Sequence, residues 1–470
     1  LNSNIAFTLC QMLTSGAVEA LEAHASEAQK DKYLHQIISG NWSATMNLTE
    51  PQAGSDVGAV KTKAEPQPDG TYKIYGTKIY ITYGDHDMTE NIIHLVLART
   101  PGAPEGTKGI SLFIVPKFFV NDDGSLGDRN DVKCIGLEDK LGIHASPTCV
   151  MSFGENDGAT GWLIGAENTG MAAMFTMMNN ARLNVGIQGV GLAEQATQLA
   201  MSYAADRVQG RAPDAERGDN TPVPISTHPD VRNMLMTMRA LTDAARAICY
   251  ENGVFHDLAH FGGDERAKAF NELLTPISKA FSTDIANEVS SLGVQIHGGM
   301  GFVEETGIAQ FARDAKILPI YEGTNGIQAI DLINRKLPLA NGAILSEYLT
   351  QIEETITHCA SEETLKELSA ALENGLADLR AATDFMMTHP DKLDRLYGAT
   401  DYLTLFGLVA GGHYLARGAL GTMKTNEMTH KVKTATFFMD RLLPRTKGHL
   451  ASILSAKEHL DNEEIFHIVG

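Results

Sequence analysis

The sequence is poor in cysteine and tryptophan and contains no long hydrophobic run. Its five cysteines are odd in number and widely scattered, without a CxxC pair, so they indicate neither a disulfide framework nor a zinc site. No uninterrupted apolar segment approaches the roughly 20 residues that a membrane-spanning helix needs. We therefore expect a protein of a reducing compartment with no signal peptide, no bound metal and no membrane partner.

Basic residues are also scarce relative to acidic ones. Counting 38 Lys and Arg against 58 Asp and Glu gives a formal net charge of −20. This balance argues against nucleic acid as a partner, although a single arginine can still bind a phosphate. With 470 residues, 43% of them hydrophobic, the chain can bury a large core and form two or more packed units.

Hydrophobic periodicity divides the chain into a helical part, a strand-rich part and further helical parts. Residues 1–40 have helical spacing and, because the chain begins at Leu1 rather than at a methionine, we expect the end of a truncated N-terminal helical domain. Short β-branched and aromatic runs over 41–165, separated by Gly-containing turns, predict an antiparallel β-domain. Helical spacing returns over 166–338, as a bundle, and continues over 339–470 as an additional helical region.

The additional region shows packing patterns and no chemistry. Leucines three and four residues apart over 365–379 predict a helix behind a candidate N-cap at Ser361, and a second helix is predicted over 403–420. Segment 211–229, rich in Pro, Asp and Gly, predicts an exposed loop within the preceding bundle. Close helix contacts are indicated by four glycines of the second helix, Gly407, Gly411, Gly412 and Gly418.

One carboxylate stands at a glycine-flanked break after an apolar segment. Glu322 is followed by Gly323 and Gly326, which let the backbone turn sharply and approach a ligand closely. A catalytic base would suit this position. An acid at a helix start can also simply complement the helix dipole, so the residues alone leave both interpretations open.

Several motifs, taken in order, resemble the acyl-CoA dehydrogenase family. Residues 46–56, Met-Asn-Leu-Thr-Glu-Pro-Gln-Ala-Gly-Ser-Asp, are similar to the signature that opens the sheet domain of that family. Further similar motifs are Tyr-Gly-Thr-Lys-Ile-Tyr-Ile-Thr at 75–82, Gln-Ile-His-Gly-Gly-Met-Gly-Phe at 295–302 and Ile-Tyr-Glu-Gly-Thr-Asn-Gly at 320–326. The resemblance covers roughly residues 42–335, more than a single short motif achieves by chance.

The resemblance implies an α+β fold of the acyl-CoA dehydrogenase type. Such a fold has an N-terminal helical domain, an antiparallel β-barrel-like middle domain and a C-terminal helical bundle, here followed by the additional helical region. The resemblance also implies bound FAD and a homodimer, while pairing of two dimers into a tetramer is left open.

The expected FAD-binding residues follow from the same resemblance. Tyr80, where the family more often has Trp, is expected to pack against the flavin ring, although a strand Tyr more commonly enters a core. Arg207 is expected to reach the diphosphate of the neighbouring subunit's FAD, because a planar guanidinium suits phosphate oxygens; its alternative is to complement a helix C-terminus. His297 is treated as structural. The full cofactor-binding set is Leu48, Thr49, Ser55, Tyr80, Thr82, Arg207, Gln295, Gly299 and Thr324.

The implied reaction is α,β-dehydrogenation of an acyl-CoA thioester to a trans-2-enoyl-CoA. Glu322 is expected to remove the α-proton, which requires a raised pKa of Glu322 and a polarised thioester carbonyl. Ala181 occupies the position where other branches of the family carry the base, and alanine cannot accept a proton. Ser55, Arg182 and Gly323 are expected to contact the substrate, with a salt bridge inside the bundle as the alternative for Arg182.

The length of the chain is similar to that of one branch of the family. The loop at 211–229, the region after Pro338 and the runs 136–148 and 321–328 resemble long bacterial members that include 3-methylmercaptopropionyl-CoA dehydrogenases of dimethylsulfoniopropionate breakdown. The resemblance implies conversion of 3-methylmercaptopropionyl-CoA to methylthioacryloyl-CoA in the bacterial cytoplasm, with electron-transfer flavoprotein as the electron acceptor. Alternatives are a broad-specificity fatty acyl-CoA dehydrogenase of β-oxidation, an acyl-CoA oxidase, a nitroalkane oxidase, which would carry Asp at the base position, and a non-enzymatic binding protein.

Overall fold

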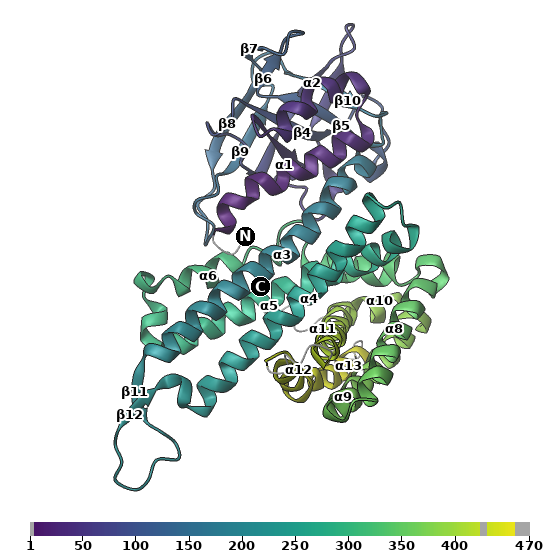
Figure 1. Cartoon of the computed structure of the whole chain (residues 1–470). Helices are drawn as coiled ribbons and strands as arrows, with labels where there is room; N and C mark the ends of the chain where they lie inside the picture. The colour runs from purple at the N-terminus through teal and green to yellow at the C-terminus, as the bar shows by residue number, and fades with distance from the viewer. Residues whose placement is uncertain (1–3, 424–429, 456–470) are drawn as a thin grey trace, which may run out of the picture. The chain divides into compact units, whose positions relative to one another are not determined.

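The computed structural model describes residues 4–423 and 430–455, which fall into two compact units (Figure 1). The first unit is Asn4–Ala181 and the second runs from Arg182 onward. Helices come first, then strands, then helices again, so the predicted α+β class is confirmed. The four domains that the sequence predicts, with their three boundaries, stay predictions.

Two capped helices begin the first unit, α1 (Ile5–His24) and α2 (Glu27–Ile38). The side chain of Asn4 accepts a hydrogen bond from the backbone N–H of Phe7 at 3.0 Å. Ser26 and Gln29 form a capping box at the start of α2. These caps satisfy N–H groups that lack partners at a helix start, which explains where the two helices begin.

The sheet of the first unit has eight strands and is mixed rather than wholly antiparallel. Strand β1 (Trp42–Asn47) pairs in parallel with β4 (Asn91–Ala98), which corrects the predicted antiparallel pattern at this edge. Seven of the eight strands follow the order β1-β4-β5-β10-β3-β9-β8, and the eighth, β2, pairs with β3 beside this path. Because β1 and β8 lie at opposite ends of the order, the strands described do not close into a barrel. The remaining strands of this unit are β2 (Lys63–Pro66), β3 (Tyr72–Thr82), β5 (Ser111–Pro116), β6 (Phe118–Val120), β7 (Leu126–Arg129), β8 (Val132–Leu137), β9 (Thr148–Phe153) and β10 (Ala159–Ile164), with β6 and β7 forming a separate hairpin.

The central strands of the sheet are buried on both faces. Every residue of β4 and of β5 is buried, which is why these strands read as continuous apolar runs in the sequence. His94 of β4 is a polar residue inside this apolar core. Its Nδ1 lies 2.7 Å from Thr45 Oγ1, and burial lowers the pKa of its imidazole to about 3. His94 is therefore a neutral member of the core.

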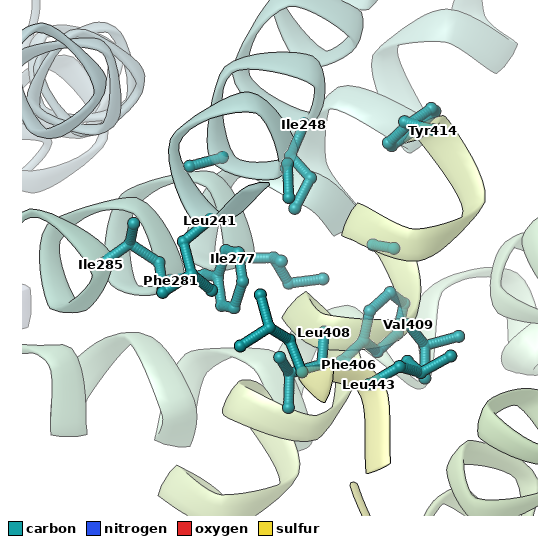
Figure 2. Packing of buried hydrophobic residues seen from close by; sticks show 14 of the residues in the cluster. Leu241, Ile248, Ile277, Phe281, Ile285, Phe406, Leu408, Val409, Tyr414 and Leu443 are labelled. Atoms are coloured by element: carbon teal, nitrogen blue, oxygen red, sulfur yellow. The ribbon is translucent and has the colours of Figure 1, made fainter. Parts of the chain in front are cut away.

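The second unit is helical. Helix α3 (Gly170–Asp206) ends in it, and α4 (Pro229–His260) and α5 (Glu265–His297) follow. Ile277, Phe281 and Ile285 of α5 lie four residues apart and form a buried stripe, and Figure 2 shows them among residues of α4 and of α11 (Ala399–Met423). Further elements of this unit are β11 (Val208–Arg211), β12 (Pro222–Pro224), α6 (Ile308–Ala315), α7 (Asn325–Asp331), the π-helix at Leu332–Lys336, α8 (Ala343–Ala360), α9 (Lys366–Thr388), α10 (Lys392–Tyr397), α12 (His430–Arg441) and α13 (Thr446–Leu454).

Two details of the additional helical region differ from the sequence predictions. Ser361 is the C-cap of α8 and does not start the next helix, because a short 3-10 turn at Glu363–Leu365 intervenes before α9. A Cβ at Gly407 or Gly411 would clash with a neighbouring helix, whereas the space around Gly418 is open to 4 Å. A Cβ at Gly412 would lie 3.3 Å from Met439 Cε, which is a tight contact. The glycine prediction is therefore right at Gly407, Gly411 and Gly412 and wrong at Gly418.

The predicted exposed loop contains two short paired strands. Strands β11 and β12 form a two-stranded ribbon whose turn, over residues 212–221, is largely exposed. Of the helices that the structure describes, none combines the length and the apolarity needed to span a bilayer.

Candidate active site

Glu322 lies in a strained turn immediately before helix α7. Its φ of 56° is in the left-handed region, where a residue with a side chain is strained at a cost of about 1–3 kcal/mol. Gly323 follows with φ 83°, and the Thr324 side chain caps α7 by accepting a hydrogen bond from the Ile327 N–H at 3.2 Å. The predicted glycine-flanked break before a helix is present, and it is a place where backbone strain is stored.

Neighbouring side chains hold the carbonyl groups of this turn. Lys279 Nζ donates to the carbonyl oxygen of Gly323 and to Asn325 Oδ1, both at 2.9 Å. Gln328 Nε2 donates to the carbonyl oxygens of Gly323, at 3.3 Å, and of Glu322, at 3.4 Å. A Cβ at position 323 would stand 2.8 Å from Gln328 Nε2, so the turn requires glycine there.

The carboxylate of Glu322 is enclosed and makes no ion pair with the residues that the structure describes. Its Oε2 is buried and has no hydrogen-bond partner among them. Burial raises the pKa of Glu322 to about 7, and the cationic groups of Arg182 and Lys279 oppose that rise. A carboxyl group that titrates near neutral pH can accept a proton during a reaction and release it afterwards, as a general base must.

Arg182 forms the salt bridge that the sequence leaves as its alternative role. Its Nη1 lies 3.2 Å from Asp331 Oδ2, and the two side chains are 5% and 2% exposed. Arg335 Nε binds the other oxygen of Asp331 at 2.5 Å. Burial lowers the pKa of Arg182, and Asp331 and then Glu322 counteract that effect. Arg182 is thus held by Asp331 while its charge acts on Glu322.

Several residues of this site are not identified by sequence reasoning. Tyr321 donates its hydroxyl proton to Gln188 Oε1, and burial followed by the nearby Glu322 raises the pKa of that hydroxyl, so Tyr321 is neutral. Lys279 is fully buried on α5, as are its neighbours Ser278 and Ala280, although a lysine is rarely buried without an ion pair. No sequence signal marks Asp331 or Gln328.

In the first unit, a buried ion pair places the predicted cofactor loop beside strand β3. Lys78 Nζ lies 2.8 Å from Glu50 Oε1 and donates to the carbonyl oxygen of Leu48 at 3.0 Å. The backbone N–H of Ile79 donates to the carbonyl oxygen of Thr49 at 3.0 Å. Burial raises the pKa of Glu50, but Lys78 and hydrogen bonds to the carboxylate outweigh it and bring the pKa to about 2. The loop is therefore fixed by a charged pair inside the fold.

Tyr80 does not enter the core. Its side chain is 60% exposed, its φ is 59°, and it lies where the register between β3 and β9 shifts. Thr82 follows on the same strand, opposite Thr148, and Ser55 is exposed in the turn after the loop. An exposed aromatic ring on a bulge next to backbone and hydroxyl groups fits a planar cofactor with polar edges, such as a flavin.

The cofactor residues predicted in the second unit are mostly exposed. Arg207 directly follows α3, and its Nη2 donates to Gln209 Oε1 at 3.3 Å. Gln295 is exposed near the end of α5, and the space around Gly299 is open to 4 Å. Thr324 uses its hydroxyl oxygen to cap α7. His297 is buried, with Nδ1 2.7 Å from the Gly293 carbonyl oxygen, which suits the structural role expected for it.

A cavity of about 570 Å³ among helices of the second unit is separate from these groups, and none of the residues discussed above lines it. Nor do the described ranges contain a cluster of three or more His, Cys, Asp or Glu side chains able to hold a metal ion.

Comparison with known proteins agrees with this arrangement. Residues 45–155 match the acyl-CoA dehydrogenase middle domain, residues 168–337 its C-terminal domain, and residues 348–461 the acetyl-CoA dehydrogenase C-terminal-like domain. The 3-methylmercaptopropionyl-CoA dehydrogenase of Ruegeria pomeroyi is 48% identical, over 98% of this chain and 79% of that protein. A butyryl-CoA dehydrogenase of Syntrophomonas wolfei is 37% identical, over 95% of this chain and 74% of that protein.

A solved structure shares the fold. The crystal structure of Caenorhabditis elegans ACDH-11 in complex with C11-CoA has a TM-score of 0.80 at 22% identity, covering 98% of this chain and 76% of that one. The chain belongs to the acyl-CoA dehydrogenase family. It is an FAD-dependent oxidoreductase that acts on acyl-CoA, which confirms the predicted family, enzyme class and cofactor.

Proposed function

We propose that this enzyme dehydrogenates a short acyl-CoA thioester between Cα and Cβ, with 3-methylmercaptopropionyl-CoA as the substrate and methylthioacryloyl-CoA as the product. The observation that carries the proposal is the enclosed, unpaired carboxylate of Glu322, whose pKa burial raises to about 7. An ion pair or several hydrogen bonds would have stabilised the charged form and made the carboxylate a weaker base.

In this proposal a carboxylate oxygen of Glu322 takes the α-proton of the thioester. FAD, when bound, supplies the acceptor for the hydride that leaves the β-carbon. Arg182 and Lys279 act on the charge of Glu322 without neutralising it by contact. The carboxylate oxygen is therefore available to the substrate, and Ala181, next to Arg182, offers no competing base.

The substrate is inferred from relatives together with the additional helical region. The identity of 48% to the Ruegeria pomeroyi enzyme extends over 98% of the chain, so it includes that region. Ser55, Arg182 and Gly323 are proposed to contact the acyl-CoA, and breakdown of dimethylsulfoniopropionate in the bacterial cytoplasm is the proposed setting. The identity to a butyryl-CoA dehydrogenase keeps a fatty acyl-CoA dehydrogenase of β-oxidation as the second candidate.

The cofactor contacts and the assembly belong to the same proposal. We propose that Leu48, Thr49, Ser55, Tyr80 and Thr82 bind the flavin of their own subunit. The partner's flavin would be bound through Arg207, Gln295 and Gly299, and Thr324 would contribute beside the catalytic turn. A homodimer is supported by Phe302, 89% exposed, and Met300, 45% exposed, because large apolar side chains exposed close to Gln295 and Gly299 favour a partner surface. Electron-transfer flavoprotein is the proposed acceptor.

The base assignment is tested by Glu322→Gln. Glutamine keeps the shape of the side chain and cannot accept the α-proton, so we expect retained FAD, retained acyl-CoA binding and flavin reduction slowed by about 10³-fold or more. The measurement is stopped-flow bleaching of the flavin under anaerobic conditions. Glu305→Gln, at an exposed acid in the same unit, serves as the matched control and should reduce flavin like the wild type. Near wild-type bleaching by Glu322→Gln would remove Glu322 from the reaction.

A further inference from the structure

A buried lysine lies next to the catalytic turn without an anionic contact. The side chain of Lys279 is fully buried on α5, and no carboxylate oxygen of the described residues lies within 4.0 Å of its Nζ. Its contacts are neutral acceptors, the Gly323 carbonyl and Asn325 Oδ1. Burying a cation without an ion pair is costly, so this placement requires a compensating role.

The contacts of Lys279 connect α5 to Gly323 and Asn325, both of which follow Glu322. Asn325 Oδ1 accepts from Lys279 and from Thr283 Oγ1, at 2.9 and 3.3 Å. Asn325 Nδ2 donates to Asp284 Oδ1 at 2.8 Å and to the Ala280 carbonyl at 3.2 Å. One turn of α5 thus holds the segment that follows Glu322, whose left-handed φ has to be maintained by its surroundings.

We propose that Lys279 is a positioning residue for the reaction: its ammonium group fixes the strained turn through the Gly323 carbonyl and supplies a positive charge to the Glu322 carboxylate without contacting it. The inference rests on the proposed role of Glu322 as the base. An ammonium group in direct contact would hold the carboxylate in its charged form and occupy a lone pair that the α-proton needs. Binding to the backbone instead leaves the carboxylate oxygens free.

The charges around Lys279 agree with this role. Burial lowers the pKa of Lys279 to about 7, Glu322 and then Asp284 raise it, and Arg182 lowers it. Arg182 is itself bound to Asp331, which also binds Arg335, while Lys316 acts on Asp284. Lys279 and Glu322 therefore titrate in the same pH range and influence each other's pKa, so that removing the lysine charge removes one of the two effects that keep the pKa of Glu322 down.

Three substitutions separate the two parts of the role. Lys279→Met removes the charge and the donor, Lys279→Gln removes the charge but keeps an amide donor, and Lys279→Arg keeps both. Lys268→Met is the matched control, because Lys268 is on the same helix and its side chain is 58% exposed. Each variant is purified with FAD, its fold is checked by circular dichroism, and the rate constant of flavin reduction by a saturating acyl-CoA is measured from pH 5.5 to 9.

We expect Lys279→Met to slow flavin reduction by about 10–100-fold, since misplacing a reacting group by about 1 Å costs that much, and to move the pH midpoint upward by about 1 unit. Lys279→Gln should reduce the flavin faster than Lys279→Met, because it keeps a hydrogen-bond donor, and should show the same raised pH midpoint as Lys279→Met. Lys279→Arg should bring the midpoint back toward the wild-type value. The apparent dissociation constant for acyl-CoA should stay within about 3-fold throughout, because Lys279 acts on kcat through Glu322.

Two results would overturn the inference. One is an unchanged midpoint in Lys279→Met and Lys279→Gln, and the other is an equal loss of rate in Lys268→Met. If Lys279→Met does not fold, the midpoints of Lys279→Gln and Lys279→Arg decide the question. Glu322→Gln is measured beside them: a slow Glu322→Gln with unaffected Lys279 variants refutes only the role of Lys279, whereas a fast Glu322→Gln refutes the proposed base itself.

Discussion

Single residues around Glu322 show how one carboxyl group is kept enclosed, with its pKa raised. The turn that carries Glu322 is strained, its carbonyls are held by Lys279 and Gln328, and the oxygen Oε2 is left without a partner. The strained backbone, the burial of the Lys279 cation and the unpartnered oxygen each have a cost in folding free energy. Such costs are typical of sites where pKa values are tuned for catalysis.

The raised pKa of Glu322 predicts a pH-dependent effect on stability. Because the pKa is about 7 in the folded state and about 4.5 when unfolded, the folded state binds more protons between these values. The stability contribution of the protonated group is fully present below about pH 4.5 and is lost as pH rises through 7, leaving a penalty on the order of 3 kcal/mol above pH 7.

Glu322→Gln should therefore raise the melting temperature more at pH 8 than at pH 5. Differential scanning calorimetry at both pH values measures this, with Glu305→Gln as the exposed control that should show no such difference. An equal effect of Glu322→Gln at the two pH values would mean that the carboxyl group is not buried enough to be penalised when charged.

At the level of elements, helix α11 packs against α5 through small residues. A Cβ at Gly407 would stand 2.4 Å from Cδ2 of Phe281, whereas a Cβ at Gly418, on the same helix, would meet no atom within 4 Å. Close approach of these two helices places the apolar residues of α11 against the stripe Ile277, Phe281 and Ile285 shown in Figure 2. Helix α5 also carries Lys279, so this packing supports the turn that contains Glu322 and Gly323.

These two glycines should respond to alanine in opposite directions. Gly407→Ala forces Phe281 to move and should destabilise the protein by about 1–3 kcal/mol. Gly418→Ala only improves helix propensity and should stabilise it by up to about 1 kcal/mol. Denaturant unfolding followed by circular dichroism compares the pair, and a neutral Gly407→Ala would show that α5 and α11 are less tightly packed than described.

Local patterns in the sequence predict much of the fold, but contacts between residues distant in the chain could not be predicted from them. The helical bundle that contains Ile277 and Phe281 could be predicted from the helical spacing over 166–338, and the break at Glu322 from its glycines. The parallel pairing of β1 with β4 could not, because partners distant in the chain leave no local signal. Lys279 was missed because a lysine within a helix is ordinarily exposed, and its acceptors come from residues more than 40 positions away.

At the level of the whole molecule, the reaction class follows from the family of the chain, whereas the acyl group of the substrate is proposed from similarity to one relative. The chain is an FAD-dependent acyl-CoA dehydrogenase by family. Of its additional helices, α8, α9, α11, α12 and α13 contribute to one buried apolar cluster together with α4 and α5, so they are part of the core of the second unit rather than an appendage. The acyl group is assigned by similarity to the Ruegeria pomeroyi enzyme and remains the central proposal.

The most direct test of that proposal is anaerobic bleaching of the flavin near 450 nm, a wavelength expected of oxidised FAD in this family, by 3-methylmercaptopropionyl-CoA, butyryl-CoA and octanoyl-CoA. The measurement compares kcat/KM, or the second-order rate constant of flavin reduction, among the three. Our account predicts that the thioether substrate reduces the flavin fastest and octanoyl-CoA slowest. The reverse order would contradict it and identify a fatty acyl-CoA dehydrogenase, and no bleaching by any of the three would contradict the proposed reaction as a whole.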